Sequence, residues 1–154
     1  MKKAPQFTLP DQNGITHTLA QYHGKWVLIY FYPKDDTPGC TKEACSFRDI
    51  SKEYKDNNVE ILGISKDSVE SHKKFELKHH LTFPLLSDES KETIQAYGAW
   101  GEKKFMGKVF EGVKRISFLI DTNGDIQKEY LQVNVFTHAK EILQDIKAVS
   151  TNTS

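Results

Sequence analysis

Unbroken apolar runs alternate along this chain with stretches whose apolar residues recur at helical spacing. The clearest run, Val-Leu-Ile-Tyr-Phe-Tyr at residues 27–32, predicts a strand over residues 25–32 that is buried on both faces, as in a sheet covered by helices on each side. Residues 59–65 predict a second strand, and residues 83–86 a short extended piece. Two further strands, at residues 115–121 and 126–133, flank a Thr-Asn-Gly-Asp hairpin turn.

Helical stretches lie between these runs. The pattern predicts helices over residues 38–56, 68–80, 89–97 and 136–149. In the second of these, the spacing places Val69, His72, Phe75 and Leu77 near the buried side. Helix breakers end two of them, because Asn57 and Asn58 follow the first and Gly98 follows the third.

The remaining segments are short or irregular. Residues 4–18 predict two extended pieces around an Asp-Gln-Asn-Gly turn, and residues 18–22 predict a helical turn. Residues 100–112 contain three glycines and are predicted to be irregular. Two strand–helix units followed by a hairpin and a closing helix predict an α/β protein of the thioredoxin-like fold, with a central mixed β-sheet and helices on both faces.

Length and composition fit one folded domain. The chain has 154 residues, of which 38% are hydrophobic, and it contains no repeat or linker. We therefore expect a single domain over residues 1–149, followed by a polar tail at residues 150–154 that frays.

Charge and hydropathy exclude several classes of partner. Acidic and basic residues balance at 21 each, so nothing favours nucleic acid or an anionic membrane. No apolar run reaches 18 residues, and the first residues lack the apolar core of a secretory signal. These observations predict a cytoplasmic protein without a membrane partner.

The candidate chemistry lies in the two cysteines, Cys40 and Cys45, which are the only ones in the chain. Cys40 is placed where a strand ends and a helix begins. Unpaired backbone N–H groups and the helix dipole favour a thiolate there, and the thiolate is the nucleophilic form. In a reducing compartment a structural bridge is not expected, and the Cys-x4-Cys spacing lacks the second Cys or His pair of a zinc site. We therefore expect thiol redox chemistry with no metal and no cofactor.

The residues around Cys40 also carry a resemblance. Pro33-x3-Thr37-x2-Cys40 matches the active-site signature of peroxiredoxins. The longer string from Tyr30 to Cys45 is similar to the peroxiredoxin Q group, also called the bacterioferritin comigratory protein group. Other pieces match in family order over nearly the whole chain: Leu9-Pro10-Asp11, residues 62–65, residues 86–88, residues 97–103 and residues 115–121.

The resemblance implies a thiol-dependent peroxidase that reduces hydrogen peroxide and organic hydroperoxides in antioxidant defence. Cys40 matches the peroxidatic cysteine, which becomes a sulfenic acid, and Cys45 matches the resolving cysteine, which forms an intramolecular disulfide with it. A thioredoxin or similar dithiol protein would recycle that disulfide. Thr37 and Arg115 match the other active-site positions, and Pro33 matches the shielding proline.

The chemistry explains these residue types. A guanidinium is always charged and offers several N–H donors, so Arg115 can stabilise the thiolate and hold the peroxide. The Thr37 hydroxyl can accept from the peroxide and donate to the thiolate. Plainer interpretations remain open: Thr37 as an N-cap only, Pro33 as the end of a strand, and Arg115 as a surface base beside Lys114.

Other polar residues receive no catalytic role from the sequence. The charge of Glu43, one turn after Cys40, would oppose thiolate formation if it pointed at the sulfur. Arg48 is left unassigned. His72, His79 and His80 are interpreted as solvated helix positions.

The five-residue spacing of Cys40 and Cys45 sets a geometric problem. On one helix their Cα atoms would lie about 8.5 Å apart, whereas a disulfide needs about 7 Å or less. Disulfide formation is therefore predicted to require unwinding of the first turns. No cysteine lies near the C-terminus to serve a partner chain, so a monomer is expected. The alternative functions are a general disulfide oxidoreductase, and a redox sensor or chaperone-like module that uses the same thiol switch.

Overall fold

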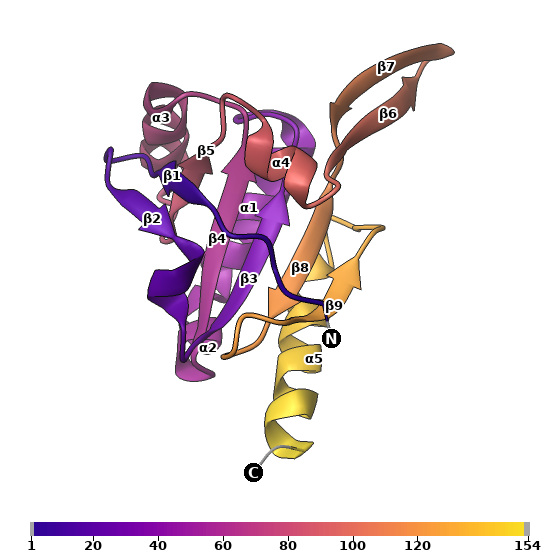
Figure 1. Ribbon diagram of the computed structural model, residues 1–154. Helices are drawn as coiled ribbons and strands as arrows, with labels where there is room; N and C mark the ends of the chain where they lie inside the picture. The colour runs from indigo at the N-terminus through magenta and orange to yellow at the C-terminus, as the bar shows by residue number, and fades with distance from the viewer. Residues whose placement is uncertain (1, 153–154) are drawn as a thin grey trace.

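A five-stranded mixed sheet forms the centre of the computed structural model, which describes residues 2–152 (Figure 1). The strand order is β5 (Leu85–Ser87), β4 (Val59–Ser65), β3 (Trp26–Phe31), β8 (Ile116–Ile120) and β9 (Ile126–Tyr130). The first three strands are parallel to one another, and β8 runs antiparallel to both β3 and β9. The strands predicted from apolar runs are therefore confirmed.

Both faces of the sheet are covered, as the apolar run of β3 predicts. Leu28, Tyr30 and Tyr32 point to one core, against α1 (Pro38–Asp49), α2 (Ser51–Asp56) and α5 (His138–Asn152). Val27, Ile29 and Phe31 point to a second core. The second core is closed by the N-terminal segment with β1 (Thr8–Pro10), β2 (Thr16–Thr18) and η1 (Leu19–Tyr22), and by α4 (Glu92–Ala96), which lie in front of the sheet in Figure 1. The helix α3 (Val69–His79) packs beside β5.

The segment predicted to be irregular is instead a β-hairpin, which corrects the prediction. It comprises β6 (Trp100–Phe105) and β7 (Lys108–Val113), and it projects from the body of the molecule (Figure 1). The turn residues Met106 and Gly107 both have positive φ, at 51° and 78°, as a two-residue hairpin turn requires. The strands were missed because most of their side chains are exposed and polar residues obscure the alternation.

Two helices differ in extent from the prediction. The single helix expected over residues 38–56 is interrupted at Ile50, whose dihedrals leave the helical region. There the Ser51 hydroxyl donates to the Arg48 carbonyl, competing with the helical pattern. The helix expected over residues 89–97 begins only at Glu92, because Lys91 has a left-handed φ of 67°.

Three further expectations need correction. Leu77 was placed on the buried side of α3 but is 62% exposed. His72 is fully buried, which confirms the helical spacing that placed it near the buried side and contradicts its interpretation as a solvated position. The closing helix α5 includes residues 150–152, where a frayed tail was expected. Residues 153 and 154 of that expected tail lie outside the described residues. Among the residues described, no helix is both long and apolar enough to cross a membrane.

Candidate active site

Cys40 lies in the first turn of α1, beyond the C-terminal end of β3. Pro38 occupies the first helical position, where a missing N–H costs nothing. The Cys40 side chain packs among the core residues beneath α1, and the residue is 1% exposed. The sequence therefore placed this thiol correctly at a strand-to-helix junction, but the structure adds that the thiol is buried.

Arg115 contacts the sulfur of Cys40 directly. It lies in the two-residue link between β7 and β8, and its Nη2 donates to Cys40 Sγ at 3.2 Å. Partial burial opposes the charge of this guanidinium, but Glu43 and Cys40 outweigh that effect and hold the pKa of Arg115 above its ordinary value. The interpretation of Arg115 as a plain surface base is wrong, because the guanidinium faces the thiol.

Glu43 supports the same guanidinium from α1. Its Oε1 accepts from Arg115 Nη1 at 2.7 Å, and the residue is 1% exposed. Burial raises the pKa of Glu43 to about 7, and the charge of Arg115 only partly opposes this shift. The sequence interpretation gave Glu43 no role. Its position three residues after Cys40, on the same helix face, was the signal that could have found it.

Thr37 precedes the helix as predicted, but its side chain is used differently. The backbone of Thr37 accepts from Thr41 N at 2.8 Å, whereas its hydroxyl donates to the Lys34 carbonyl at 2.9 Å. Thr37 is therefore the N-cap residue of α1, as expected, but its hydroxyl makes no capping hydrogen bond and does not donate to Cys40. Its lone pairs remain available to accept a hydrogen bond. Pro33 follows β3 closely and is partly exposed.

Cys45 and Cys40 are both free thiols on one continuous helix. Cys45 is partly buried, whereas Cys40 is enclosed. The estimate from helix geometry, about 8.5 Å between their Cα atoms, therefore applies to this state. A disulfide between them is incompatible with an intact α1.

A second polar cluster adjoins the segment that leads to Cys40. Asp35, Asp67 and His72 bring potential metal-ligand atoms within 4.8 Å of one another. His72 Nδ1 lies 2.7 Å from Asp35 Oδ2, and the Asp67 carboxylate accepts from the Asp35 backbone N–H and the Ser65 hydroxyl. The cluster is therefore a hydrogen-bond network. It was missed because the sequence places these residues in separate loops and helices.

Buried polar atoms also lie beneath α1. Among the described residues, Tyr30 Oη, Glu43 Oε2 and His138 Nδ1 have no hydrogen-bond partner. The other ring nitrogen of His138 lies 2.8 Å from the Ser117 hydroxyl. Burial, followed by the charge of Arg115, lowers the pKa of His138 to about 4. The ring is therefore neutral near pH 7.

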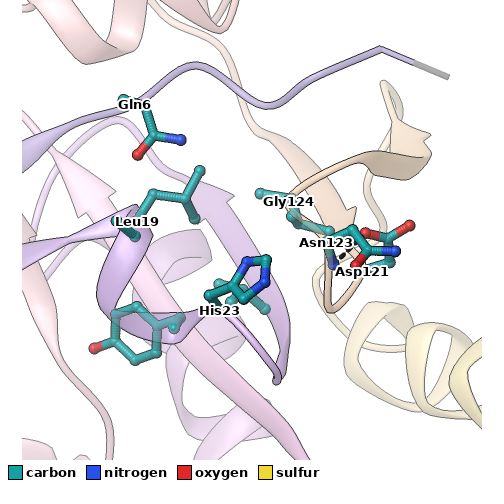
Figure 2. A pocket seen from close by; sticks show the side chains of 10 residues that line it. Gln6, Leu19, His23, Asp121, Asn123 and Gly124 are labelled. Carbon is teal, nitrogen blue, oxygen red and sulfur yellow. Dashed lines mark hydrogen bonds between the residues drawn. The ribbon is translucent and has the colours of Figure 1, made fainter.

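A separate cavity of about 210 Å³ lies at the other end of β3 (Figure 2). Its lining includes Gln6, Leu19, His23, Asp121 and Asn123. The site residues predicted from the sequence do not line it. The backbone of Asn123 donates to the Asp121 carboxylate at 2.9 Å, so this carboxylate supports a turn.

The chain is similar to known proteins over nearly its whole length. Residues 1–129 match the model of the AhpC/TSA family. The chain is 44% identical over 149 residues to peroxiredoxin Bcp of Bacillus subtilis, covering 97% of this chain and 95% of that protein. It is 46% identical over 144 residues to peroxiredoxin Bcp of Escherichia coli, covering 94% and 92%.

Solved structures are similar over the same length. A structure of the Xanthomonas campestris bacterioferritin comigratory protein, described for its alkyl peroxide reduction activity, matches with a TM-score of 0.89 and 37% identity. The match covers 94% of this chain and 92% of that one. This similarity confirms the thioredoxin-like fold predicted from the sequence.

Proposed function

The chain belongs to the AhpC/TSA family and is a peroxidase of its Bcp, or peroxiredoxin Q, branch, and we propose that it reduces hydrogen peroxide and organic hydroperoxides through Cys40. The observation that carries the proposal is the 3.2 Å contact from Arg115 Nη2 to Cys40 Sγ. A permanent positive charge at a buried sulfur stabilises the thiolate, which is the form that attacks a peroxide.

In the first step the Cys40 thiolate attacks one peroxide oxygen. An S–O bond forms and the O–O bond breaks, so that Cys40 becomes a sulfenic acid. The other oxygen leaves as hydroxide or alkoxide and takes a proton to give water or an alcohol. Arg115 is suited to stabilise the negative charge that develops on this leaving oxygen, because its donors are already oriented by Glu43.

Thr37 and Pro33 complete the proposed site. The Thr37 hydroxyl gives its hydrogen to Lys34, so it would act on the peroxide as an acceptor only. Pro33 has no N–H group, and it would shield one wall of the pocket without adding a donor. Both residues belong to the segment that connects β3 to α1.

In the second step Cys45 attacks the sulfenic sulfur of Cys40. An S–S bond forms, the S–O bond breaks, and the oxygen leaves as water. This step requires the first turns of α1 to unwind, because Cys40 is buried and both thiols lie on one helix. Gly39 favours such an opening, since glycine is about 1 kcal/mol less favourable than alanine in a helix.

The disulfide would be reduced by a dithiol protein of the thioredoxin type, which exchanges thiols with Cys40 or Cys45. Because both redox thiols lie in the same chain, the cycle needs no partner subunit, and we propose a monomer. The reducing conditions that this cycle requires fit the cytoplasm.

The test is peroxide consumption coupled to thioredoxin and its reductase. The native protein should turn over, Cys40→Ser should be inactive, and Cys45→Ser should reduce one equivalent of peroxide and then stop. Peptide mapping after one equivalent should find the Cys40–Cys45 disulfide in the native protein. Full activity of Cys40→Ser would refute the site. A disulfide without turnover would favour a redox sensor instead.

A further inference from the structure

The segment at residues 33–37, which connects β3 to α1 and carries Thr37, is bound to other elements mainly through Asp35. Asp35 is 7% exposed, and its carboxylate contacts three side chains, those of Tyr32 just after β3 and of Ser71 and His72 on α3. Tyr32 Oη donates to Oδ1 at 2.5 Å, Ser71 Oγ donates to Oδ2 at 2.8 Å, and His72 Nδ1 lies 2.7 Å from Oδ2. A surface turn does not need this number of contacts.

His72 extends the connection across α3 to the edge of the sheet. The ring is fully buried, and its Nε2 lies 3.0 Å from the Leu86 carbonyl of β5. A carbonyl oxygen only accepts, so Nε2 carries a hydrogen. The other ring nitrogen, Nδ1, lies 2.7 Å from Asp35 Oδ2, within hydrogen-bond distance. His72 thereby joins Asp35 to β5 through two hydrogen bonds.

The backbone of the segment is held as well. Asp35 N donates to Asp67 Oδ2 at 2.9 Å, and Ser65 Oγ donates to the same oxygen at 2.7 Å. The neighbouring Asp36 has a left-handed φ of 60°, and its carboxylate accepts from Lys78 and lies 3.1 Å from the His79 ring. Both aspartates therefore bind groups on α3 or on the loop before it.

We propose that Asp35 and His72 are positioning residues for the peroxide step. Together with Tyr32 and Ser71 they form a clamp that fixes residues 33–37, and thereby holds Thr37 and the first turn of α1 where Cys40 meets the peroxide. The inference rests on the proposed function, because peroxide reduction is its readout. Asp35 lies two residues before Thr37 and five before Cys40. The clamp does not contact the peroxide itself and acts by positioning Thr37 and Cys40.

A merely structural role is the rival explanation, and the chain contains a matched control for it. His17 Nε2 lies 2.7 Å from Asp11 Oδ2, and both residues are buried. This pair has the same chemistry and length as the Asp35–His72 pair, but it connects β2 to the turn after β1. Its hydrogen bonds involve none of residues 33–40.

The experiment measures, by stopped flow, the second-order rate constant for oxidation of Cys40 by hydrogen peroxide, together with the melting temperature. Asp35→Ala should slow oxidation by about tenfold or more, since small misplacements at a reacting centre have effects of this order. Asp35→Asn should restore most of the rate, because the amide can accept from Tyr32 and donate to His72 and Ser71. Asp11→Ala should lower the melting temperature without slowing oxidation.

The proposal is overturned if Asp35→Ala reacts at the native rate, or if Asp11→Ala is slowed equally. If Asp35→Ala does not fold, Ser71→Ala is measured instead, because it removes only one partly buried donor to Asp35. A native oxidation rate in Ser71→Ala would also overturn the proposal. Absence of peroxide oxidation in the native protein would instead refute the proposed function. The native measurement thus separates failure of the clamp from failure of the function.

Discussion

Arg115 reaches the sulfur of Cys40 from a position 75 residues later in the chain. The antiparallel pairing of β8 with β3 makes this contact possible, because Ile116 pairs with Phe31 at the end of β3. The residue just before β8 therefore lies beside the start of the helix that follows β3. Sheet register, and not local sequence, brings the charge to the thiol.

Arg115→Lys is predicted to slow peroxide reduction by about 10- to 100-fold, which corresponds to the loss of one charged hydrogen bond of about 1.5–3 kcal/mol. The ammonium keeps the charge, but it lacks the planar fork that contacts Cys40 and Glu43 together. Stopped-flow oxidation of Cys40 measures the effect.

The matched control is Arg48→Lys. Arg48 lies on α1, the helix that carries Cys40 and Glu43, and its guanidinium also contacts a carboxylate and one further acceptor, Asp49 and the His79 carbonyl. The peroxide rate of this variant should stay near the native value. If both variants slow the reaction equally, the contact between Arg115 and Cys40 has no special role.

Unwinding of α1 on oxidation is the second prediction. In the reduced protein the amides of residues 41–48 are held by helical hydrogen bonds, and formation of the Cys40–Cys45 disulfide should make them exchange at least about tenfold faster with solvent. Hydrogen exchange followed by mass spectrometry reports this change, and α5 serves as the internal reference. Equal protection of α1 in the reduced and disulfide forms would contradict the predicted unwinding.

The sequence predicted the central sheet well because the inner strands β3, β4 and β8 are rich in buried apolar residues, whereas the edge strand β9 was found from the hairpin turn before it. The strand over residues 59–65 was predicted with its observed limits, and the α/β order of elements implied helices on both faces. The β6–β7 hairpin was not predictable in the same way. Its residues are exposed on a projecting arm, so burial imposes no apolar alternation on them.

The active site was only partly predictable, for a similar reason. The placement of Cys40 follows from a local pattern, a strand followed by a helix start. The contacts of Glu43 and His72 depend on tertiary neighbours that lie far away in the sequence, at Arg115 and Asp35. Sequence spacing shows which helix face such residues occupy, but it does not show which charge they meet.

Glu43→Gln is the third prediction, and it concerns stability against pH. Burial raises the pKa of Glu43 from 4.5 to about 7, so between these values the folded state binds more protons than the unfolded state. The free energy of unfolding should therefore fall as pH rises through this window, by up to about 3 kcal/mol from this residue. Glu43→Gln abolishes that contribution.

Urea unfolding at intervals from pH 4.5 to 8 measures the effect as the difference in free energy between Glu43→Gln and the native protein. As pH rises, the free energy of unfolding of Glu43→Gln should increase relative to that of the native protein. Replacement of the exposed Glu89 by Gln is the control, and it should produce no comparable trend. A pH-independent difference for Glu43→Gln would show that the pKa of Glu43 is not raised in the folded protein.

The fourth prediction concerns His138, whose contribution to the free energy of unfolding changes with pH in the opposite direction to that of Glu43. Burial lowers the pKa of His138 from 6.5 to about 4, so the unfolded state binds more protons between these values. Stability from this residue therefore rises with pH across the window and is lost on acidification, by up to about 3 kcal/mol. The windows of Glu43 and His138 overlap between pH 4.5 and 6.5, and their contributions offset each other in the native protein.

Single variants should separate the contributions of Glu43 and His138, which offset each other in the native protein. The double variant, which keeps every other titrating group, is the reference. Relative to it, Glu43→Gln retains the His138 contribution and should gain stability as pH rises from 4.5 to 6.5, whereas His138→Gln retains the Glu43 contribution and should lose stability over the same range. Because Arg115 influences both groups, the two terms need not add fully. Once the slope of the double variant is subtracted, slopes of the same sign in the two single variants would refute the assignment, because Glu43 and His138 take up protons in opposite senses on unfolding.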